Sequence, residues 1–197
     1  MRRVALARGA RAILMPMHKT IAELENWLDE ILAAPTDSGP IEMIVLRPAV
    51  DERETLESGV LDTEVGLIGD NWMVKGSSST SDGRANPEAQ LTLMSSRVAA
   101  AIAGTRDRWP LAGDQIYVDM NLSVENLPPG TRLRIGDANI EISAKPHTGC
   151  DKFAGRFGKD ALRFANAGGG RAQRFRGVNA FVVTGGAFRV GDEIAKM

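Results

Sequence analysis

The side chain with the clearest capacity for chemistry is Cys150, the only cysteine among 197 residues. It follows His147 by three residues, in a segment (145–152) that also carries Lys145 and Lys152. Neighbouring cations favour the deprotonated thiolate, which is the form that attacks electrophiles and binds metal ions. The alternative is that Cys150 packs as a small buried apolar residue, as free cysteines commonly do. The local sequence favours a functional thiol.

His147 has two open interpretations. It could take or share the thiol proton, which would give a Cys/His pair like that of cysteine hydrolases, or it could shape the loop by hydrogen bonding alone. The hydrolase hypothesis ranks last, because the sequence shows neither an oxyanion-hole signature nor a clear third residue. His18 is the only other histidine, and no cysteine pair exists to build a thiolate zinc site.

The charges are unevenly distributed along the chain. Residues 1–143 hold 14 Lys and Arg against 21 Asp and Glu, whereas residues 144–197 hold 10 against 4. This basic segment around Cys150 indicates an anionic small-molecule ligand. Nucleic acid is disfavoured, because the positive stretch is short and the net charge is only −1. The candidate cations, of which we expect about two or three to point into the site, are Lys145, Lys152, Arg156, Arg174 and Arg176.

The composition fits one globular domain in a reducing compartment. Hydrophobic residues make up 43% and charged residues 25% of the chain, which are globular values, and a lone cysteine rules out an internal disulfide. No apolar run approaches the roughly 18 residues of a membrane span, so we expect a cytoplasmic protein. The arginines near residue 1 superficially resemble a targeting segment, but Met15 and Met17 favour a true start downstream.

Local patterns predict one N-terminal helix followed by many short strands. Thr20 and Glu23 form a capping box, the helical apolar spacing continues to Leu32, and Pro35 follows the end of the helix. Residues 35–40 have the turn chemistry of a linker, and the glycines at 168–170 predict a flexible loop rather than a phosphate-binding loop. The predicted strands are 41–47, 71–75, 90–94, 115–120, 131–135, 139–143, 178–184 and 188–194, and the further helices are 96–103 and 160–165.

Short strands separated by glycine turns predict a mainly β fold, an antiparallel sandwich or barrel. No βαβ repeat is apparent. The hairpin predicted at 131–143 leads directly into the Cys150 loop. The chain divides into an N-terminal arm, helix and linker (1–40) and a β domain (41–197).

Several short motifs occur in an order that resembles one family. They are Gly66–Asp70, Asn121-Leu122 with 129–138, His147–Cys150 with Phe157-Gly158, and 176–178 with Gly191-Asp192. No single motif is specific. Their order around one cysteine resembles the MOSC domain family, named for the C-terminal domain of molybdenum cofactor sulfurase, over roughly residues 41–195.

The resemblance implies an antiparallel closed or nearly closed β-barrel, similar to the pyruvate kinase barrel, with a few peripheral helices and the cysteine at its mouth. It also implies one of two chemistries for Cys150. In the first, the thiol would carry sulfur as a persulfide received from a pyridoxal-phosphate-dependent cysteine desulfurase. In the second, it would ligate molybdenum in the pterin cofactor, and the protein would reduce N-hydroxylated substrates with electrons from a partner protein.

In either chemistry the basic residues would grip the phosphate of the molybdenum cofactor or stabilise the thiolate, and Asn121 could reach the same pocket. Because neither a desulfurase nor an electron-transfer domain is apparent, the resemblance implies a stand-alone member that needs a partner for sulfur or electrons. The alternative is a non-catalytic barrel that binds a small anionic metabolite, in which Cys150 only packs.

Overall fold

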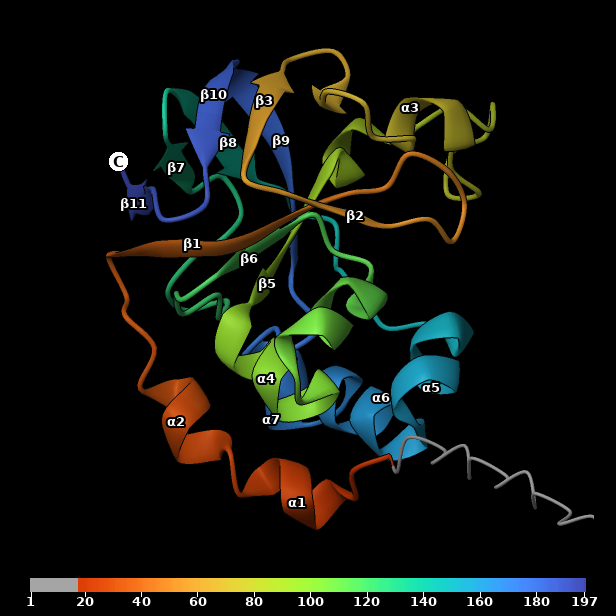
Figure 1. The fold of residues 1–197 in the computed structure, drawn as a ribbon, viewed down its shortest axis with the longest axis vertical. Coiled ribbons are helices and arrows are strands. Elements are labelled where there is room, and N and C mark those ends of the chain that lie inside the picture. Colours follow the sequence, from red (N-terminus) through yellow and green to blue (C-terminus); the bar gives the residue numbers. More distant parts are fainter. Residues whose placement is uncertain (1–17) are drawn as a thin grey trace, which may run out of the picture.

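Seven strands close into a barrel in the computed structural model, which describes residues 18–197 (Figure 1). The predicted downstream start lies outside these residues. Around the barrel each strand pairs with the next, and β1 closes the ring by pairing with β11. In this order the strands are β1 (Ser38–Leu46), β11 (Glu193–Lys196), β7 (Arg132–Ile135), β8 (Ala138–Ile142), β9 (Val178–Thr184), β5 (Leu91–Ser95) and β6 (Ile116–Val118).

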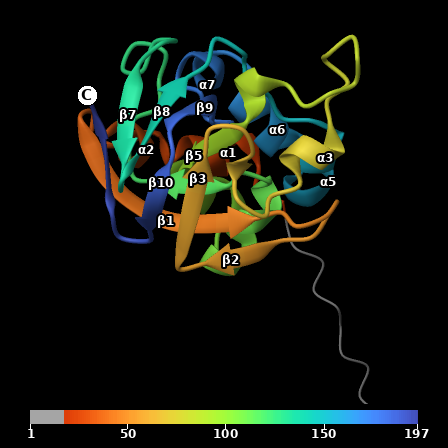
Figure 2. The same cartoon turned by 90° about the horizontal axis from the view of Figure 1, so that it is seen from above.

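A small second sheet lies over one end of the barrel. It consists of β10 (Gly186–Arg189), β3 (Ser58–Asp62) and β4 (Gly66–Leu67). Figure 2 looks down on this end and shows β3 and β10 in front of the barrel strands. A further strand, β2 (Glu54–Leu56), pairs with the end of β1 and extends the barrel wall.

The barrel is mixed, so the prediction of a purely antiparallel barrel was wrong. Strands β5 and β6 run parallel, with Leu93 opposite Ile116, and every other pair in the barrel is antiparallel. Parallel neighbours require a crossover connection. Here α4 (Ser96–Ala103) and a 3-10 segment (Arg106–Ala112) make that connection. Strand, helix and strand were each predicted from the sequence, but their combination as one βαβ unit was missed.

Four local predictions also differ from the structure. The segment predicted as a strand at 71–75 forms the short helix α3 (Trp72–Lys75), and the loop predicted at 168–170 begins helix α7 (Gly169–Ala172). The strand predicted at 188–194 is two strands, β10 and β11, separated by a turn at Gly191. Strand β1 begins at Ser38, inside the predicted linker, because Ser38–Pro40 pair with β11. Apolar composition alone did not distinguish these short elements.

The N-terminal helix is present but divided. Thr20 and Glu23 form both hydrogen bonds of the capping box, as predicted. The helix then splits into α1 (Ile21–Glu25) and α2 (Leu28–Leu32), whose Leu24 and Ile31 are buried. No helix among residues 18–197 is long and apolar enough to cross a membrane.

Two hydrophobic clusters explain why successive strand residues are apolar on both faces. Ile116 and Val118 of β6 point into the barrel interior, whereas Tyr117 between them packs outside it. The outer cluster joins the barrel wall to the helices gathered at its lower end (Figure 1). It includes Phe153 and Phe157 of α5 (Asp151–Phe157), which anchor the helix that begins directly after Cys150.

Candidate functional site

A strap of residues 145–149 connects the barrel to Cys150 and is fixed by hydrogen bonds at both ends. Asn179 of β9 donates to the carbonyl oxygen of Lys145 (3.1 Å). At the other end, Asn166 of α6 (Lys159–Asn166) accepts from the Gly149 N–H (2.9 Å) and donates to the Gly149 carbonyl oxygen (3.1 Å). A Cβ at Gly149 would lie 2.6 Å from Leu162 Cδ1, so the strap packs closely on α6.

Cys150 is exposed and occupies the N-cap position of α5. Its backbone carbonyl oxygen accepts from Ala154 N–H (3.0 Å), while its side chain makes no capping hydrogen bond. The backbone therefore fixes where Cys150 lies. The interpretation of Cys150 as a buried packing residue is wrong.

The thiol lines a cavity of about 320 Å³ whose wall is strongly cationic. Five of the predicted residues meet here: His147, Cys150, Lys152, Arg156 and Arg176. Three further cations from the acidic part of the chain complete the wall: Arg47, Arg53 and Lys75. Asp51 is the only carboxylate among the described residues that line it.

Two buried carboxylates fix two of these arginines from behind. Asp70 is fully buried and binds Arg47 in bidentate fashion, through Nε and Nη2, both at 2.8 Å. Arg47 Nη1 also donates to the Gly113 carbonyl oxygen (3.1 Å). Asp114, also fully buried, accepts from Arg176 Nη1 at 2.6 Å. Because bidentate and charge-assisted hydrogen bonds are directional, both guanidinium groups are held rigidly.

His147 lies beside the second of these pairs. Its Nδ1 is 3.4 Å from the free oxygen of Asp114, and the side chain is 14% exposed. Burial, together with the nearby Arg176 charge and against the opposing effect of Asp114, lowers the pKa of His147 to about 3. The imidazole is therefore neutral at neutral pH. It lies in the wall between the strap and the barrel, and its Nδ1 has no hydrogen-bond partner among the described residues, so the loop-shaping role by hydrogen bonding stays a prediction.

Asp51 competes for two of the predicted cations. Its carboxylate accepts from Lys152 Nζ (2.9 Å) and from Arg156 Nη2 (2.8 Å). These contacts, with the Lys152 hydrogen bond as the largest cause, lower the pKa of Asp51. The residue adopts a positive φ of 65°, so the loop 49–53 turns sharply to present it. Asp51 thus neutralises part of the positive charge that Lys152 and Arg156 bring to the cavity.

Arg53 and Lys75 form no ion pair within residues 18–197 and leave positive charge uncompensated. Arg53 Nη1 donates only to the carbonyl oxygen of Glu52, and its Nε is buried without a hydrogen-bond partner. Burial, with the repulsion of Arg156 and Arg47, lowers the pKa of Arg53. A buried, unpaired guanidinium N–H costs free energy unless a ligand accepts from it. The cavity therefore has the charge and the free donors to bind an anion.

The remaining predicted site residues lie elsewhere. Lys145 and Arg174 line a neighbouring cavity on the other side of the strap. Asn121 lines neither cavity: its Oδ1 accepts from Ser123 N–H (2.9 Å) and so forms a local turn. The structure thus brings together five of the eight predicted residues, and the role assigned to Asn121 stays a prediction.

Several residues of the site come from the part of the chain before residue 120 and were not predicted from the sequence. Asp70 belongs to the motif Gly66–Asp70, which was noted only for the family resemblance, and Asp114 directly precedes the predicted strand 115–120. Arg47, Arg53 and Lys75 carried no signal, because a count of charges along the chain does not show which cations share a face. The partner of each buried arginine could be identified only from the fold.

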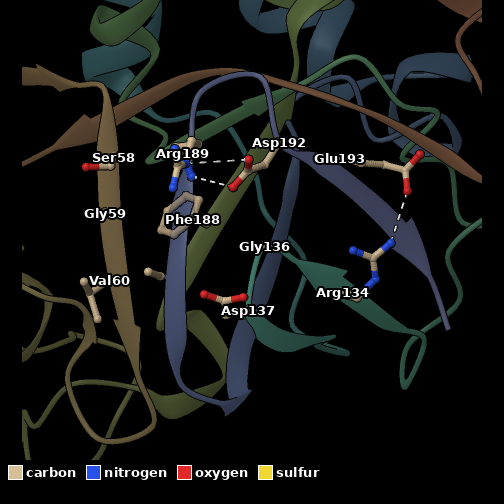
Figure 3. Close-up of a pocket in the computed structure, with 11 residues that line it drawn as sticks. Ser58, Gly59, Val60, Arg134, Gly136, Asp137, Phe188, Arg189, Asp192 and Glu193 are labelled. Carbon is tan, nitrogen blue, oxygen red and sulfur yellow. Dashed lines mark hydrogen bonds and ion pairs between the residues drawn. The ribbon is translucent and has the colours of Figure 1, made fainter.

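Another cavity, of about 510 Å³, lies away from Cys150 (Figure 3). It is formed by β3, β10 and the turn after β7, and its described lining carries two arginines and three carboxylates. Arg134 pairs with Glu193 (3.1 Å) and Arg189 with Asp192 (4.0 Å). Figure 3 shows these pairs and the Phe188 ring, with no thiol or imidazole nearby. Its size alone does not make it a reactive site.

The chain is similar to known proteins in sequence pattern and in fold. A family model described as MOSC domain matches residues 80–195. The YuaD protein from Bacillus subtilis aligns with a TM-score of 0.60 at 16% identity, covering 80% of this chain and 94% of that one. YiiM from Escherichia coli aligns with a TM-score of 0.54 at 18% identity, covering 81% and 69%. YiiM from Geobacillus stearothermophilus aligns with a TM-score of 0.53 at 14% identity, covering 81% and 75%. At these identities the structural matches establish the fold alone, and no curated protein sequence matches the chain.

Proposed function

The chain belongs to the MOSC domain family, and from this premise we propose that it handles the molybdenum cofactor or its sulfur through the thiol of Cys150. The observation that carries the proposal is the position of that thiol. It is exposed on the wall of a cavity in which the buried Arg53 Nε has no hydrogen-bond partner. A soft sulfur ligand and an unsatisfied cation thus share one cavity.

The residues present fit a large anionic cofactor. Arg53 and Lys75 have free donors, and the fixed guanidinium groups of Arg47 and Arg176 present a rigid cationic wall. Arginine forks match phosphate oxygens in bidentate geometry, and a thiolate suits a metal that already has sulfur ligands. When bound, the molybdenum centre would supply the redox chemistry for reducing N-hydroxylated substrates. The chain itself would bind and orient the cofactor and exclude water from its anionic groups.

A second candidate, persulfide transfer, is favoured by the exposure of Cys150. A sulfur carrier must be reached by the persulfide of another protein, and the Cys150 side chain makes no capping hydrogen bond that would restrain it. The Cys150 thiolate would attack the outer sulfur of the donor's persulfide, the donor S–S bond would break, and the donor thiolate would leave. This chemistry requires a persulfide donor, and the family resemblance implies that the donor is a pyridoxal-phosphate-dependent cysteine desulfurase. The other alternative, a barrel that only binds an anionic metabolite, needs the cations but not the thiol.

One experiment distinguishes the three candidates. Protein produced in a host that makes the molybdenum cofactor is analysed for molybdenum and for cysteine-bound sulfane sulfur, as wild type, Cys150→Ser and Arg53→Gln. Cofactor binding predicts molybdenum in wild type and about tenfold less in both variants, because Arg53→Gln removes a charge-assisted contact. Persulfide transfer predicts sulfane sulfur that is lost in Cys150→Ser and kept in Arg53→Gln.

The matched control is Arg163→Gln, which removes one positive charge from an exposed arginine of α6 that does not line the cavity. It should behave as wild type in both assays. Absence of both molybdenum and sulfane sulfur from the wild type would refute the proposal. Retention of an anionic metabolite by Cys150→Ser would then favour the binding-only alternative.

A further inference from the structure

The strap 145–149 separates the Cys150 cavity from a second cavity of about 390 Å³, which the proposed function does not use. His147 and Thr148 line both cavities, so this part of the strap is the wall between them. The two cavities also share one loop on the barrel side. Arg176 lines the first cavity, and Arg174, two residues earlier, lines the second.

The second cavity is cationic and has no opposing charge. Lys145, Arg171 and Arg174 line it, and none of its described lining residues is a carboxylate. Lys145 Nζ donates to the Ser79 hydroxyl (3.1 Å), and Arg171 forms no ion pair within the described part of the chain. The described wall of this cavity thus carries three positive charges and no negative one, which favours the binding of an anion.

Arg174 is the residue most clearly built into this cavity. It adopts a positive φ of 51°, which a non-glycine residue rarely does. Its carbonyl oxygen accepts from Gly177 N–H (2.7 Å), and its Nη1 donates to the Leu127 carbonyl oxygen (2.6 Å). Half-buried and without an acidic partner, it has a pKa that burial lowers. The backbone therefore holds a partly desolvated guanidinium at a fixed position with donors to spare.

We propose that this second cavity is a binding site for a phosphate group, held by Lys145, Arg171 and Arg174 and separate from the Cys150 cavity. A phosphate dianion has three terminal oxygens and a charge that three cations can neutralise, whereas a single carboxylate would leave two cations unpaired. Arginine forks bind phosphate in bidentate fashion, and lysine adds a point charge. The source is free phosphate or a small phosphomonoester, and the two share this chemistry.

The test follows inorganic phosphate binding by amide signals in ¹H–¹⁵N NMR at constant ionic strength. Ala144 and Gly177 line only the second cavity, and Gly76 and Gly113 line only the Cys150 cavity, so each pair reports on one site. Phosphate should shift the Ala144 and Gly177 signals saturably. Arg174→Gln and Arg171→Gln should each raise the Kd from these signals about tenfold or more, the usual effect of losing a charge-assisted contact.

Two variants keep the test decisive, because Arg171 is exposed and its loss should leave the fold intact even if Arg174→Gln does not fold. Arg163→Gln, which lines neither cavity, should keep the wild-type Kd. Glycerol 3-phosphate, titrated next, should bind more tightly than phosphate if the natural ligand is a phosphomonoester, and no more tightly if it is free phosphate.

Several results would overturn the proposal. They are shifts confined to Gly76 and Gly113, an unchanged Kd in Arg171→Gln, or equal weakening by Arg163→Gln. Shifts confined to the Cys150 cavity would reject the second site while leaving the proposed function of Cys150 intact, so the two proposals fail separately.

Discussion

Replacing Asp114 by asparagine tests how much the buried ion pair between Asp114 and Arg176 contributes to stability. Asp114 is fully buried, and the side chain of its partner Arg176 is only 8% exposed, with 2.6 Å between Oδ2 and Nη1. The amide keeps the shape of the carboxylate but removes its charge, so a buried guanidinium loses its counter-ion. Breaking one partner of such a pair costs about 3–5 kcal/mol. The neutral His147 beside it supplies no replacement charge.

The assay is urea unfolding at pH 7 with thermal unfolding alongside. For a domain of this size about 1 kcal/mol corresponds to about 2–4 °C, so Asp114→Asn should lower the melting temperature by about 6–20 °C. The matched control is Glu193→Gln, which breaks the exposed pair with Arg134 (3.1 Å) and should cost about 1 kcal/mol or less. If the two variants lose equal stability, the argument that Asp114 and Arg176 are desolvated is wrong.

Three further predictions concern the same region. Gly177→Ala should lower the free energy of unfolding in urea by about 2 kcal/mol or more, because φ is 102° and a Cβ would lie 2.3 Å from a backbone carbonyl oxygen. Gly191→Ala, where φ is 90° but no atom lies within 4 Å of the added Cβ, should lower it clearly less. Equal losses of stability would show that the close approach at Gly177 is unimportant. Burial lowers the pKa of His147 to about 3, so as pH falls from about 6.5 towards 3 the unfolded chain binds a proton that the folded chain does not. Over this pH range the free energy of unfolding should therefore fall more steeply with decreasing pH in wild type than in His147→Gln. Parallel pH profiles of the two proteins would contradict the lowered pKa. Asp51→Asn should release the two cations that the carboxylate binds. The ratio of Cys150 alkylation rates by anionic iodoacetate and by neutral iodoacetamide should then rise about twofold to tenfold at low salt. An unchanged ratio would show that these charges do not act on the thiol.

The fold was predictable where a local signal was strong. The capping box at Thr20, the helix 96–103 and the strand 178–184 all appear as the sequence indicates. The barrel's mixed character was not predicted, because pairing direction depends on how a crossover packs and not on the composition of the strands it joins. Helix α3 was mistaken for a strand since four residues are too few to show a periodicity.

The site was predictable around its cysteine and less so around its charges. Neighbours of Cys150 in sequence, such as Lys152 and Arg156, do line its cavity, but Asp51 neutralises much of their charge. The cations of the cavity that form no ion pair within residues 18–197, Arg53 and Lys75, come from the acidic part of the chain (1–143). Which cations lack an acidic partner depends on ion pairs formed in the folded structure, and these pairs cannot be inferred from the order of residues in the sequence.

The closure of the barrel by β1 and β11 has a consequence for biosynthesis. Ser38 pairs with Ala195, so one edge of the earliest barrel strand has no partner until β11 has been made. At typical elongation rates of about 5–20 residues per second, that edge waits roughly 10–30 s. An unpaired strand edge is a template for association with other chains. A nascent chain of this protein is therefore most vulnerable to aggregation before β11 has been made, and we expect chaperones that bind ribosome-attached chains to raise its yield.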